Sequence, residues 1–448
     1  MRTIAKTKSW LVWSCAAALL AAGTLPALAQ DPAAPAAATA AKTDAGDTAW
    51  VLMGTALVML MTPALAFFYG GLVRKKNYLS ILMQCFMILC LISLQWVLLG
   101  YSLAFGPDKG SVIGGLEWLG LNGVGSAPHA YAPTIPHSTF MIFQMMFAVI
   151  TPALIVGAFA ERMKFSAFCV FSLLWATLVY DPLAHWVWGK GGFLGADGWG
   201  ALDFAGGTVV HINAGMTALA AALILGKRQG YPRIVSPPHS LPWAVLGAGL
   251  LWFGWFGFNA ASALGANGLA SSAFVATHTA AATAGAVWAF LDWFFHKKPT
   301  TLGMITGAVA GLVSITPAAG FVTPLGAICI GVGAAGFPWL CVTFLKPRMG
   351  YDDSLDAFGV HGVGGIWGAI ATGLFASPAI NPAVTNGNFV QTIIQFKTTV
   401  LSMVFSFVLG FVLLKIVDVV VGLRVSEHEE RVGLDLTQHK EAAYTVID

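Results

Sequence analysis

Apolar stretches long enough to cross a lipid bilayer recur along almost the whole chain, and they restrict its fold more than any other feature. A transmembrane helix needs about 20 mainly apolar residues. Because these stretches are continuous rather than alternating, they exclude a β-barrel and predict an all-α polytopic membrane protein. We identify eleven spans, of which the eighth is the shortest, at residues 49–73, 77–105, 137–160, 166–187, 205–226, 242–262, 270–294, 301–317, 323–345, 355–376 and 391–422.

Composition supports this prediction and excludes several functions. Charged residues make up 10% of the chain, against about 25% in soluble domains. The net charge of +3 is too small to indicate a nucleic-acid partner. The cysteines are scattered through apolar stretches without ligand spacing, so no metal site, cofactor or disulfide framework is predicted.

The first residues have the pattern of a targeting segment. Basic residues precede an apolar run, and Ala27-Leu28-Ala29 forms a small-x-small cleavage site. We therefore predict a signal peptide over residues 1–29 and a flexible periplasmic linker over residues 30–48. An uncleaved first transmembrane helix is the alternative, although the apolar run is shorter than a span requires.

Basic residues predict the orientation of the spans. Alternate loops of the transmembrane domain, residues 49–422, are rich in lysine and arginine, whereas the opposite loops hold little beyond Lys109 and Lys190. The positive-inside rule then places the N-terminus outside and the tail, residues 423–448, in the cytoplasm of a bacterial-type inner membrane. The basic loops contain Arg74-Lys75-Lys76, Arg162, Lys164, Lys227, Arg228, Arg233, Lys297-Lys298, Lys346 and Arg348.

Two glycine-rich segments place ionisable residues inside predicted spans. One runs from Asp203 to His211 in the fifth span, and the other runs from Asp356 to His361 in the tenth. Since the segments lie five spans apart, their orientations are opposite, and they predict an inverted repeat of spans 1–5 and 6–10 with the eleventh span outside it. The solute path in such folds lies near the midplane, between the repeats.

Other polar residues of the spans have simpler interpretations. Asp203 and Asp356 are placed to cap the first turns of their helices. His278 is expected to be a hydrogen-bonded packing residue, and Asp181 and His185 are expected near the headgroups at the outer end of the fourth span. Glycines at close-packing intervals, Gly303, Gly307 and Gly311, predict a tightly packed bundle.

The histidine pair limits what can pass along such a path. Neutral imidazoles exchange hydrogen bonds and protons, but they cannot replace the hydration shell of a permanent cation. We therefore expect a permeant species that is small, polar and neutral, or that sheds its proton on entry. The alternative is a pair of structural imidazoles, each hydrogen-bonded to a backbone carbonyl.

The same segments resemble the signature regions of the Amt/Mep/Rh ammonium transporters, most closely those of the bacterial Amt branch. The similarity covers essentially the whole chain after the linker. It is carried by DFAGGTVVHINAG and DAFGVHGVGG, and also by AFFYGGLVRKKN, FQMMFAVITPALIVGAFAER, YDPLAHWVWG, GWFGFNAASA, ITPAAG and the tail GLRVSEHEERVGLDL.

The resemblance implies an eleven-span homotrimer with one pore per subunit, which carries ammonium or ammonia and also methylammonium. It implies that ammonium is received at an outer site, that two stacked rings form a gate below it, and that a histidine pair lines the pore. By position these would be Phe143, Phe147, Trp188 and Ser262 for recruitment, Phe147 and Phe258 for the gate, His211 and His361 for the pore, and Asp203, Tyr180, Trp255 and Thr316 as pore-lining or supporting residues.

The resemblance also implies a regulatory role for the tail. The tail looks like the segment through which bacterial Amt proteins meet PII signalling proteins at the cytoplasmic face. Three other functions are alternatives: an Rh-like gas channel, disfavoured by Trp188; an ammonium sensor, disfavoured by the short tail; and an intramembrane hydrolase, for which no nucleophile or metal motif is present. Whether net transport carries charge stays open.

Overall fold

The computed structural model describes residues 42–233, 236–385 and 387–444. The predicted signal peptide, residues 1–29, and most of the predicted linker lie outside the described residues. The first described helix, α2, begins at Ala45, inside the segment predicted as linker, and Asp44 caps it by accepting a hydrogen bond from the Asp47 backbone N–H.

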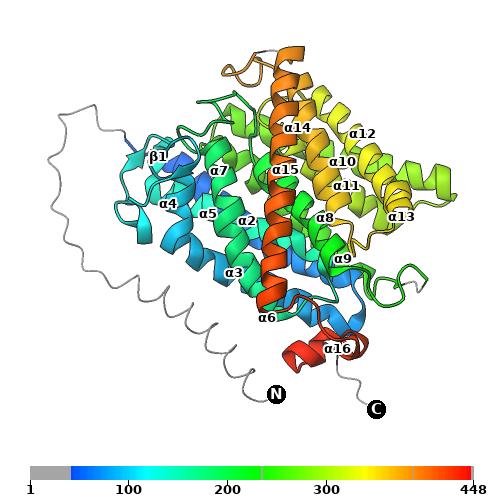
Figure 1. Ribbon diagram of the computed structural model, residues 1–448. Coiled ribbons are helices and arrows are strands. Elements are labelled where there is room, and N and C mark those ends of the chain that lie inside the picture. Colours follow the sequence, from blue (N-terminus) through cyan, green and yellow to red (C-terminus); the bar gives the residue numbers. More distant parts are fainter. Residues whose placement is uncertain (1–41, 234–235, 386, 445–448) are drawn as a thin grey trace.

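The described chain is a bundle of long apolar helices, as predicted (Figure 1). Ten helices among the described residues are long and apolar enough to cross a membrane. The eighth predicted span is the shorter apolar helix α11, which starts at Thr301 and does not extend further toward the N-terminus. The spans are built from α2 (Ala45–Leu72), α3 (Tyr78–Gln95) with η3 (Trp96–Gly100) and α4 (Tyr101–Phe105), α5 (His137–Phe159), α6 (Phe165–Trp175) with η5 (Ala176–Tyr180) and α7 (Asp181–Trp188), η6 (Gly207–Ile212) with α8 (Asn213–Leu225), α9 (Leu241–Ala260) with η7 (Ala261–Ala263), α10 (Gly268–His296), α11 (Thr301–Ile315), α12 (Pro324–Leu340) with η8 (Cys341–Leu345) and α13 (Lys346–Met349), η9 (Phe358–Val363) with α14 (Gly364–Phe375), and α15 (Phe389–Val420).

Short elements complete the two ends of the bundle. One end carries two small hairpins and a 3-10 turn in the loop before α5. The other end carries the tail, and Figure 1 shows α15 running the height of the molecule into α16 at its lower end. These elements are β1 (Asp108–Lys109), β2 (Ile113–Gly114), η4 (Leu119–Leu121), β3 (Pro128–His129), β4 (Ala132–Pro136), η2 (Lys75–Asn77), α16 (Glu427–Val432) and η10 (Asp435–His439).

Glycines let the helix backbones approach closely, as the sequence predicts for α11. A Cβ on Gly307 would lie 2.4 Å from the Trp288 Cβ, and one on Gly311 would lie 2.7 Å from the Ala280 carbonyl oxygen. The same holds between α2 and α9, where a Cβ on Gly247 would meet the Phe68 nitrogen at 2.3 Å. Small residues therefore set the close packing expected of helices in lipid.

The two halves of the predicted repeat pack on each other reciprocally. A Cβ on Gly215 would lie 2.2 Å from the Gly362 nitrogen, and one on Gly365 would lie 3.1 Å from the Ile212 nitrogen. Gly215 and Gly365 stand at the same sequence distance after His211 and His361. Equivalent glycines thus bring η6 against α14 and η9 against α8, as an inverted repeat requires.

Buried aspartates cap both histidine-bearing turns, but one of them is not the predicted residue. The Asp203 carboxylate accepts hydrogen bonds from the backbone N–H groups of residues 206–209. In the other half the cap is Asp353, which accepts from Ala357 and Phe358. The prediction that Asp356 caps this helix is wrong. Asp356 has a φ of 58° and pairs with Lys346 at 2.6 Å instead.

Several loops predicted to share the cytoplasmic side meet at the tail end of the bundle. The buried Glu161 carboxylate pairs with Arg74 at 2.9 Å and with Arg228 at 3.3 Å. Arg228 also pairs with Asp352 at 2.8 Å, and Arg162 donates a 2.6 Å hydrogen bond to the Asp352 carbonyl. These predicted inner loops are therefore joined by the ion pairs of Arg74 and Arg228.

The tail is folded onto the same loops. The Ser426 and Glu429 side chains form a capping box at the start of α16. Glu430 is buried and accepts hydrogen bonds from Arg424 at 2.8 Å and from the Gln229 backbone at 2.7 Å. Asp435 accepts a 2.8 Å hydrogen bond from the Ser80 backbone N–H at the start of α3. The tail thus links α3, α15 and the loop after α8.

One further prediction, for His278, is wrong, and two other polar residues of the spans lie inside the protein. Asp181 and His185, which are predicted to lie near the headgroups at the outer end of the fourth span, have side chains that are fully buried within the protein. Asp181 accepts a 2.7 Å hydrogen bond from Gln95, and His185 bonds to Asp108 at 2.9 Å. His278 was expected to be a satisfied packing residue, yet it is exposed in this single chain and lies against Trp252 with ring centroids 5.3 Å apart.

Candidate functional site

Both histidines of the predicted pair lie on π-helical turns at the contact between the two halves. His211 lies on η6 and His361 lies on η9. Their rings stack with centroids 5.3 Å apart and an interplanar angle of 11°. The Tyr69 hydroxyl lies 3.4 Å from His361 Nε2 and donates to the Leu154 carbonyl. Single π-helical turns are frequent at functional sites.

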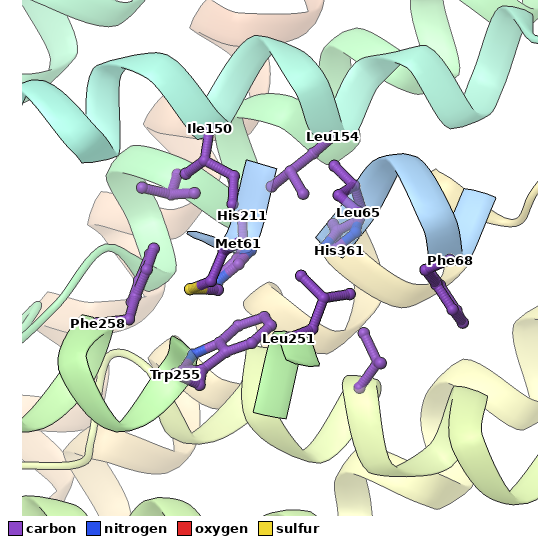
Figure 2. A pocket seen from close by; sticks show the side chains of 12 residues that line it. Met61, Leu65, Phe68, Ile150, Leu154, His211, Leu251, Trp255, Phe258 and His361 are labelled. Carbon is purple, nitrogen blue, oxygen red and sulfur yellow. The ribbon is translucent and has the colours of Figure 1, made fainter. Parts of the chain in front are cut away.

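The two imidazoles face a narrow cavity with otherwise apolar walls (Figure 2). Its volume of about 10 Å³ is at the lower limit for one water molecule. The central cavity, as we call it, is therefore too small for a hydrated cation. It is lined by Met61, Leu65, Phe68, Ile150, Leu154, Val210, His211, Leu251, Trp255, Phe258, Val309 and His361.

Several histidine ring nitrogens at the central cavity have no hydrogen-bond partner among the described residues. Neither ring nitrogen of His211 has a hydrogen-bond partner among them, nor does His361 Nδ1. A buried polar atom without a partner is costly, and the residues around these atoms are apolar. The arrangement therefore suits a small neutral molecule that donates and accepts hydrogen bonds.

A second pocket lies on the side of the bundle away from the tail, and we call it the distal pocket. Its volume is about 180 Å³, and its walls are mainly aromatic. The Ser262 hydroxyl donates to the Phe258 carbonyl, so its oxygen can still accept, and the buried Gln144 Oε1 has no partner among the described residues. The lining residues are Phe105, Tyr131, Phe140, Gln144, Phe147, Trp188, Phe204, Ser262 and Leu264.

Two phenylalanine rings separate the distal pocket from the central cavity. Phe147 lines the former and Phe258 the latter, and their centroids are 4.4 Å apart. Trp188 lies edge-on to Phe147 at 5.9 Å. Phe143 does not line the distal pocket but packs behind Phe147 at 5.0 Å. The structure thus brings together the recruitment and gate residues implied by the resemblance, with Phe143 in a supporting position.

A third pocket, the tail-side pocket, continues from the other end of the central cavity. The two share Phe68, Val309 and His361. The tail-side pocket has a volume of about 190 Å³ and includes the polar side chains of Ser354 and Asp356. The three pockets therefore form one sequence through the bundle, interrupted by the Phe147–Phe258 contact.

The predicted supporting residues hold this arrangement in place. Trp255 donates a 2.8 Å hydrogen bond to Thr316, which fixes a ring stacked on His211 at 5.5 Å. Trp188 donates a 2.9 Å hydrogen bond to the Asp203 carbonyl, so the residue that caps η6 also positions the distal tryptophan. Tyr180 is fully buried among aromatic rings and lines none of the three pockets.

Comparison with known proteins shows the family to which this chain belongs. The model of the Ammonium Transporter Family matches residues 49–444. This chain belongs to the ammonium transporter family. It is 54% identical over 403 residues to the ammonium transporter of Bacillus subtilis, covering 89% of this chain and 98% of that protein. It is 47% identical to the ammonium transporter Amt1 of Archaeoglobus fulgidus, with 89% and 99% covered. The family is one of transporters and not of enzymes.

Solved structures of the family share the fold. Saccharomyces cerevisiae Mep2 is 37% identical and superposes with a TM-score of 0.81, covering 86% of this chain and 89% of that one. A sensor Amt protein is 31% identical and also has a TM-score of 0.81, with 88% and 98% covered. The helical membrane architecture predicted from the sequence is confirmed.

Some lining residues were not predicted from the sequence. Gln144 lies one helical turn before Phe147. The neighbouring residues in the sequence do not indicate that its side-chain oxygen has no hydrogen-bond partner among the described residues. Tyr131 lies in a loop far from the other motifs, and Tyr69 lies in a span without a histidine motif. The i, i+3 relation of Gln144 to Phe147 was the available signal, since such residues share one helix face.

Proposed function

We propose that this chain conducts ammonia derived from ammonium along the distal pocket, the central cavity and the tail-side pocket. The observation that carries the proposal is the stacked histidine pair in an apolar cavity too small for a hydrated ion, with an aromatic pocket directly beyond it. Family membership supports ammonium as the substrate.

Ammonium is captured in the distal pocket. A cation over an aromatic face gains about 0.5–2 kcal/mol, and Trp188 and Phe147 supply such faces. The Ser262 oxygen and Gln144 Oε1 accept the ammonium N–H groups. Because these acceptors are neutral and fixed, a small cation with several N–H donors fits this pocket better than one without donors.

The species that crosses the central cavity is neutral ammonia rather than ammonium. A charge at the bilayer centre costs at least about 2.5–3.5 kcal/mol, and the central cavity has no carboxylate among its lining residues. Ammonium therefore gives up its proton at the Phe147–Phe258 contact to the His211 imidazole, whose ring lies 6.0 Å from Phe258 and whose nitrogens have no partner among the described residues. Ammonia then passes the two imidazoles, which exchange hydrogen bonds with it and can relay the proton. Beyond His361 it reaches the polar walls of the tail-side pocket.

In this proposal the distal pocket opens to the periplasm and the tail lies in the cytoplasm of a bacterial inner membrane. The loops that meet at the tail end are those rich in lysine and arginine, which favours this orientation. An alkaline phosphatase domain fused to the C-terminus should be inactive, and activity would invert the orientation. We also propose a homotrimer, which native mass measurement of the purified protein would test.

A PII-type signalling protein is the proposed partner at the tail end. The docked tail and the loops beneath it form one folded surface, with exposed Lys75, Lys227 and Arg348 beside the paired arginines. Such charges favour association that weakens as salt rises. A partner loop entering the tail-side pocket would block the route at its inner end.

The function is tested with purified protein in liposomes. Steps in ammonium, methylammonium or potassium concentration are applied, and transport is followed as current and as uptake. We expect responses to ammonium and methylammonium and none to potassium, because potassium has no proton to shed. Equal responses to potassium would contradict the proposal. The current also decides whether net transport carries charge.

A further inference from the structure

Lys190 lies at the rim of the distal pocket and is fixed against one of its walls. It follows Trp188 in the loop after α7 (Asp181–Trp188). Its backbone N–H donates a 2.8 Å hydrogen bond to the Tyr131 hydroxyl, and its Nζ lies 5.7 Å from the centroid of the Tyr131 ring. Tyr131 lines the distal pocket. The positively charged Lys190 side chain therefore lies next to a ring that forms part of the pocket wall.

The Tyr131 ring is not free to turn away from this cation. It stacks on Phe140 with centroids 5.1 Å apart and an interplanar angle of 5°. Phe105 meets it edge-on at 5.2 Å. Both neighbours also line the distal pocket. The Tyr131 ring is therefore held in place beside both Lys190 and the distal pocket.

The charge of Lys190 is not neutralised by an ion pair within the described residues. Lys109, the other basic residue of the predicted outer loops, pairs with Glu117 at 2.8 Å. Two carboxylates of these loops bond to other groups, since Asp197 accepts from the Gly191 backbone and Asp108 accepts from His185. Lys190 therefore contributes a positive charge beside the pocket that no ion pair within the described residues offsets.

We propose that Lys190 is an affinity-determining residue for the cation captured in the distal pocket. Its charge repels ammonium held in the pocket that Tyr131 lines. The side chain thus raises the ammonium concentration at which transport is half-saturated. It leaves the maximal rate unchanged, because the species that passes Phe258 is neutral. The inference rests on the proposed capture of ammonium in this pocket.

The test compares charge-neutral and charge-keeping variants in liposomes at low ionic strength. Lys190→Gln keeps the backbone bond to Tyr131 and should lower the half-saturating ammonium concentration by about twofold, the effect expected of one charge several ångströms away in water. The shift should shrink toward zero at 1 M inert salt, where the screening length is about 3 Å. Lys190→Arg should behave as the parent. The matched control Lys109→Gln removes a paired charge and should change nothing.

Each remaining outcome counts against the inference. A Lys190→Gln protein with parental half-saturation at low salt would overturn it. So would an equal shift in Lys190→Arg, or a shift that persists at high salt, because these indicate a structural effect. Trp188→Leu is measured alongside. If that variant alone shifts half-saturation, only the role of Lys190 fails. If neither variant shifts it, capture in the distal pocket fails as well.

Discussion

Aromatic faces and imidazole nitrogens impose opposite requirements along the route. The faces of Trp188 and Phe147 attract a cation, whereas the apolar walls around His211 and His361 disfavour one. The two environments meet at Phe258, whose ring lies 4.4 Å from Phe147 and 6.0 Å from His211. A single ring contact thus divides the region suited to ammonium from the region suited to ammonia.

Replacing Trp188 should impair capture without impairing conduction. Trp188→Leu removes a cation–π contribution of about 0.5–1 kcal/mol, so half-saturation should rise by about two- to fivefold, with little change in maximal flux. The measurement is methylammonium uptake over a concentration series. Trp199→Leu is the control, since Trp199 is exposed and does not line the pocket. An unchanged concentration dependence in Trp188→Leu would place the capture site elsewhere.

Among the secondary-structure elements, the π-helical turns η6 and η9 are the ones on which the site depends. Each begins close after an aspartate that satisfies its first backbone N–H groups. Asp203 and Asp353 stand at the same sequence distance before His211 and His361. The capping aspartates are therefore part of the internal repeat, like the histidines they position.

Isosteric variants distinguish the capping aspartate from its neighbour. Asp353→Asn turns an amide nitrogen toward a backbone N–H and should destabilise the protein by about 1–3 kcal/mol. Asp356→Asn should cost much less, because Asn tolerates a positive φ and the lost partner is the partly exposed Lys346. Thermal unfolding of the detergent-solubilised protein measures both. Equal melting temperatures for the two variants would refute the assignment.

The ion pairs that join the loops at the tail end predict a dependence on pH. Burial would raise the pKa of Glu161, but the hydrogen bonds and charge of Arg74 and the charge of Arg228 outweigh it and lower that pKa. A carboxyl with a lowered folded-state pKa contributes stability above its unfolded pKa of about 4.3, and it loses that contribution as pH falls through the folded value.

Glu161→Gln should therefore destabilise the protein at pH 7 by about 2 kcal/mol or more, since it leaves two arginines without their shared partner. The difference from the parent should close as the pH is lowered below about 4. Glu117→Gln, in an exposed pair on the opposite end, should show no measurable difference at either pH. A gap that persists in acid would show that Glu161 acts through shape rather than charge.

Sequence patterns predicted the helices and the histidines well, and for a physical reason. Crossing lipid requires long apolar runs, and each rare polar group within them stands out. Choosing between Asp353 and Asp356 required the backbone, because both precede the turn and only the φ of Asp356 turns its side chain away. Gln144 and Tyr131 were missed because the pocket they line is assembled from segments far apart in the sequence.

At the scale of the whole molecule, the tail is part of the folded end rather than an extension from it. Glu430 and Asp435 tie it to Gln229 and to the start of α3. A soluble partner would therefore meet the tail and the loops as one surface. The Tyr444 hydroxyl of the tail also lies 3.3 Å from His239, next to Pro238 of the tail-side pocket, so a change in tail docking would reach that pocket.

Pull-down of the native PII protein on membranes tests this surface. Binding should be strong with the full-length chain, weaker with Glu430→Gln, which loosens the docked tail, and lost with a chain that ends at Leu423. Each binding assay is repeated at raised salt, which should weaken the complex. Equal binding to the full-length and shortened chains would show that the tail is not part of the interface. No binding to either chain would show that the PII protein is not a partner.

In the proposed route, ammonia passes along the central cavity that the imidazoles of His211 and His361 face. This route is tested most directly by ammonium-jump transport in liposomes that hold purified His211→Leu or His361→Leu, with the exposed His278→Leu as control and elution volume as the check of folding. Both pore variants should lose at least about tenfold in rate, equivalent to about 1.4 kcal/mol for a lost hydrogen-bonding step, while His278→Leu transports like the parent. If both His211→Leu and His361→Leu transport ammonium like the parent, the histidine pair is a packing feature and the route lies elsewhere.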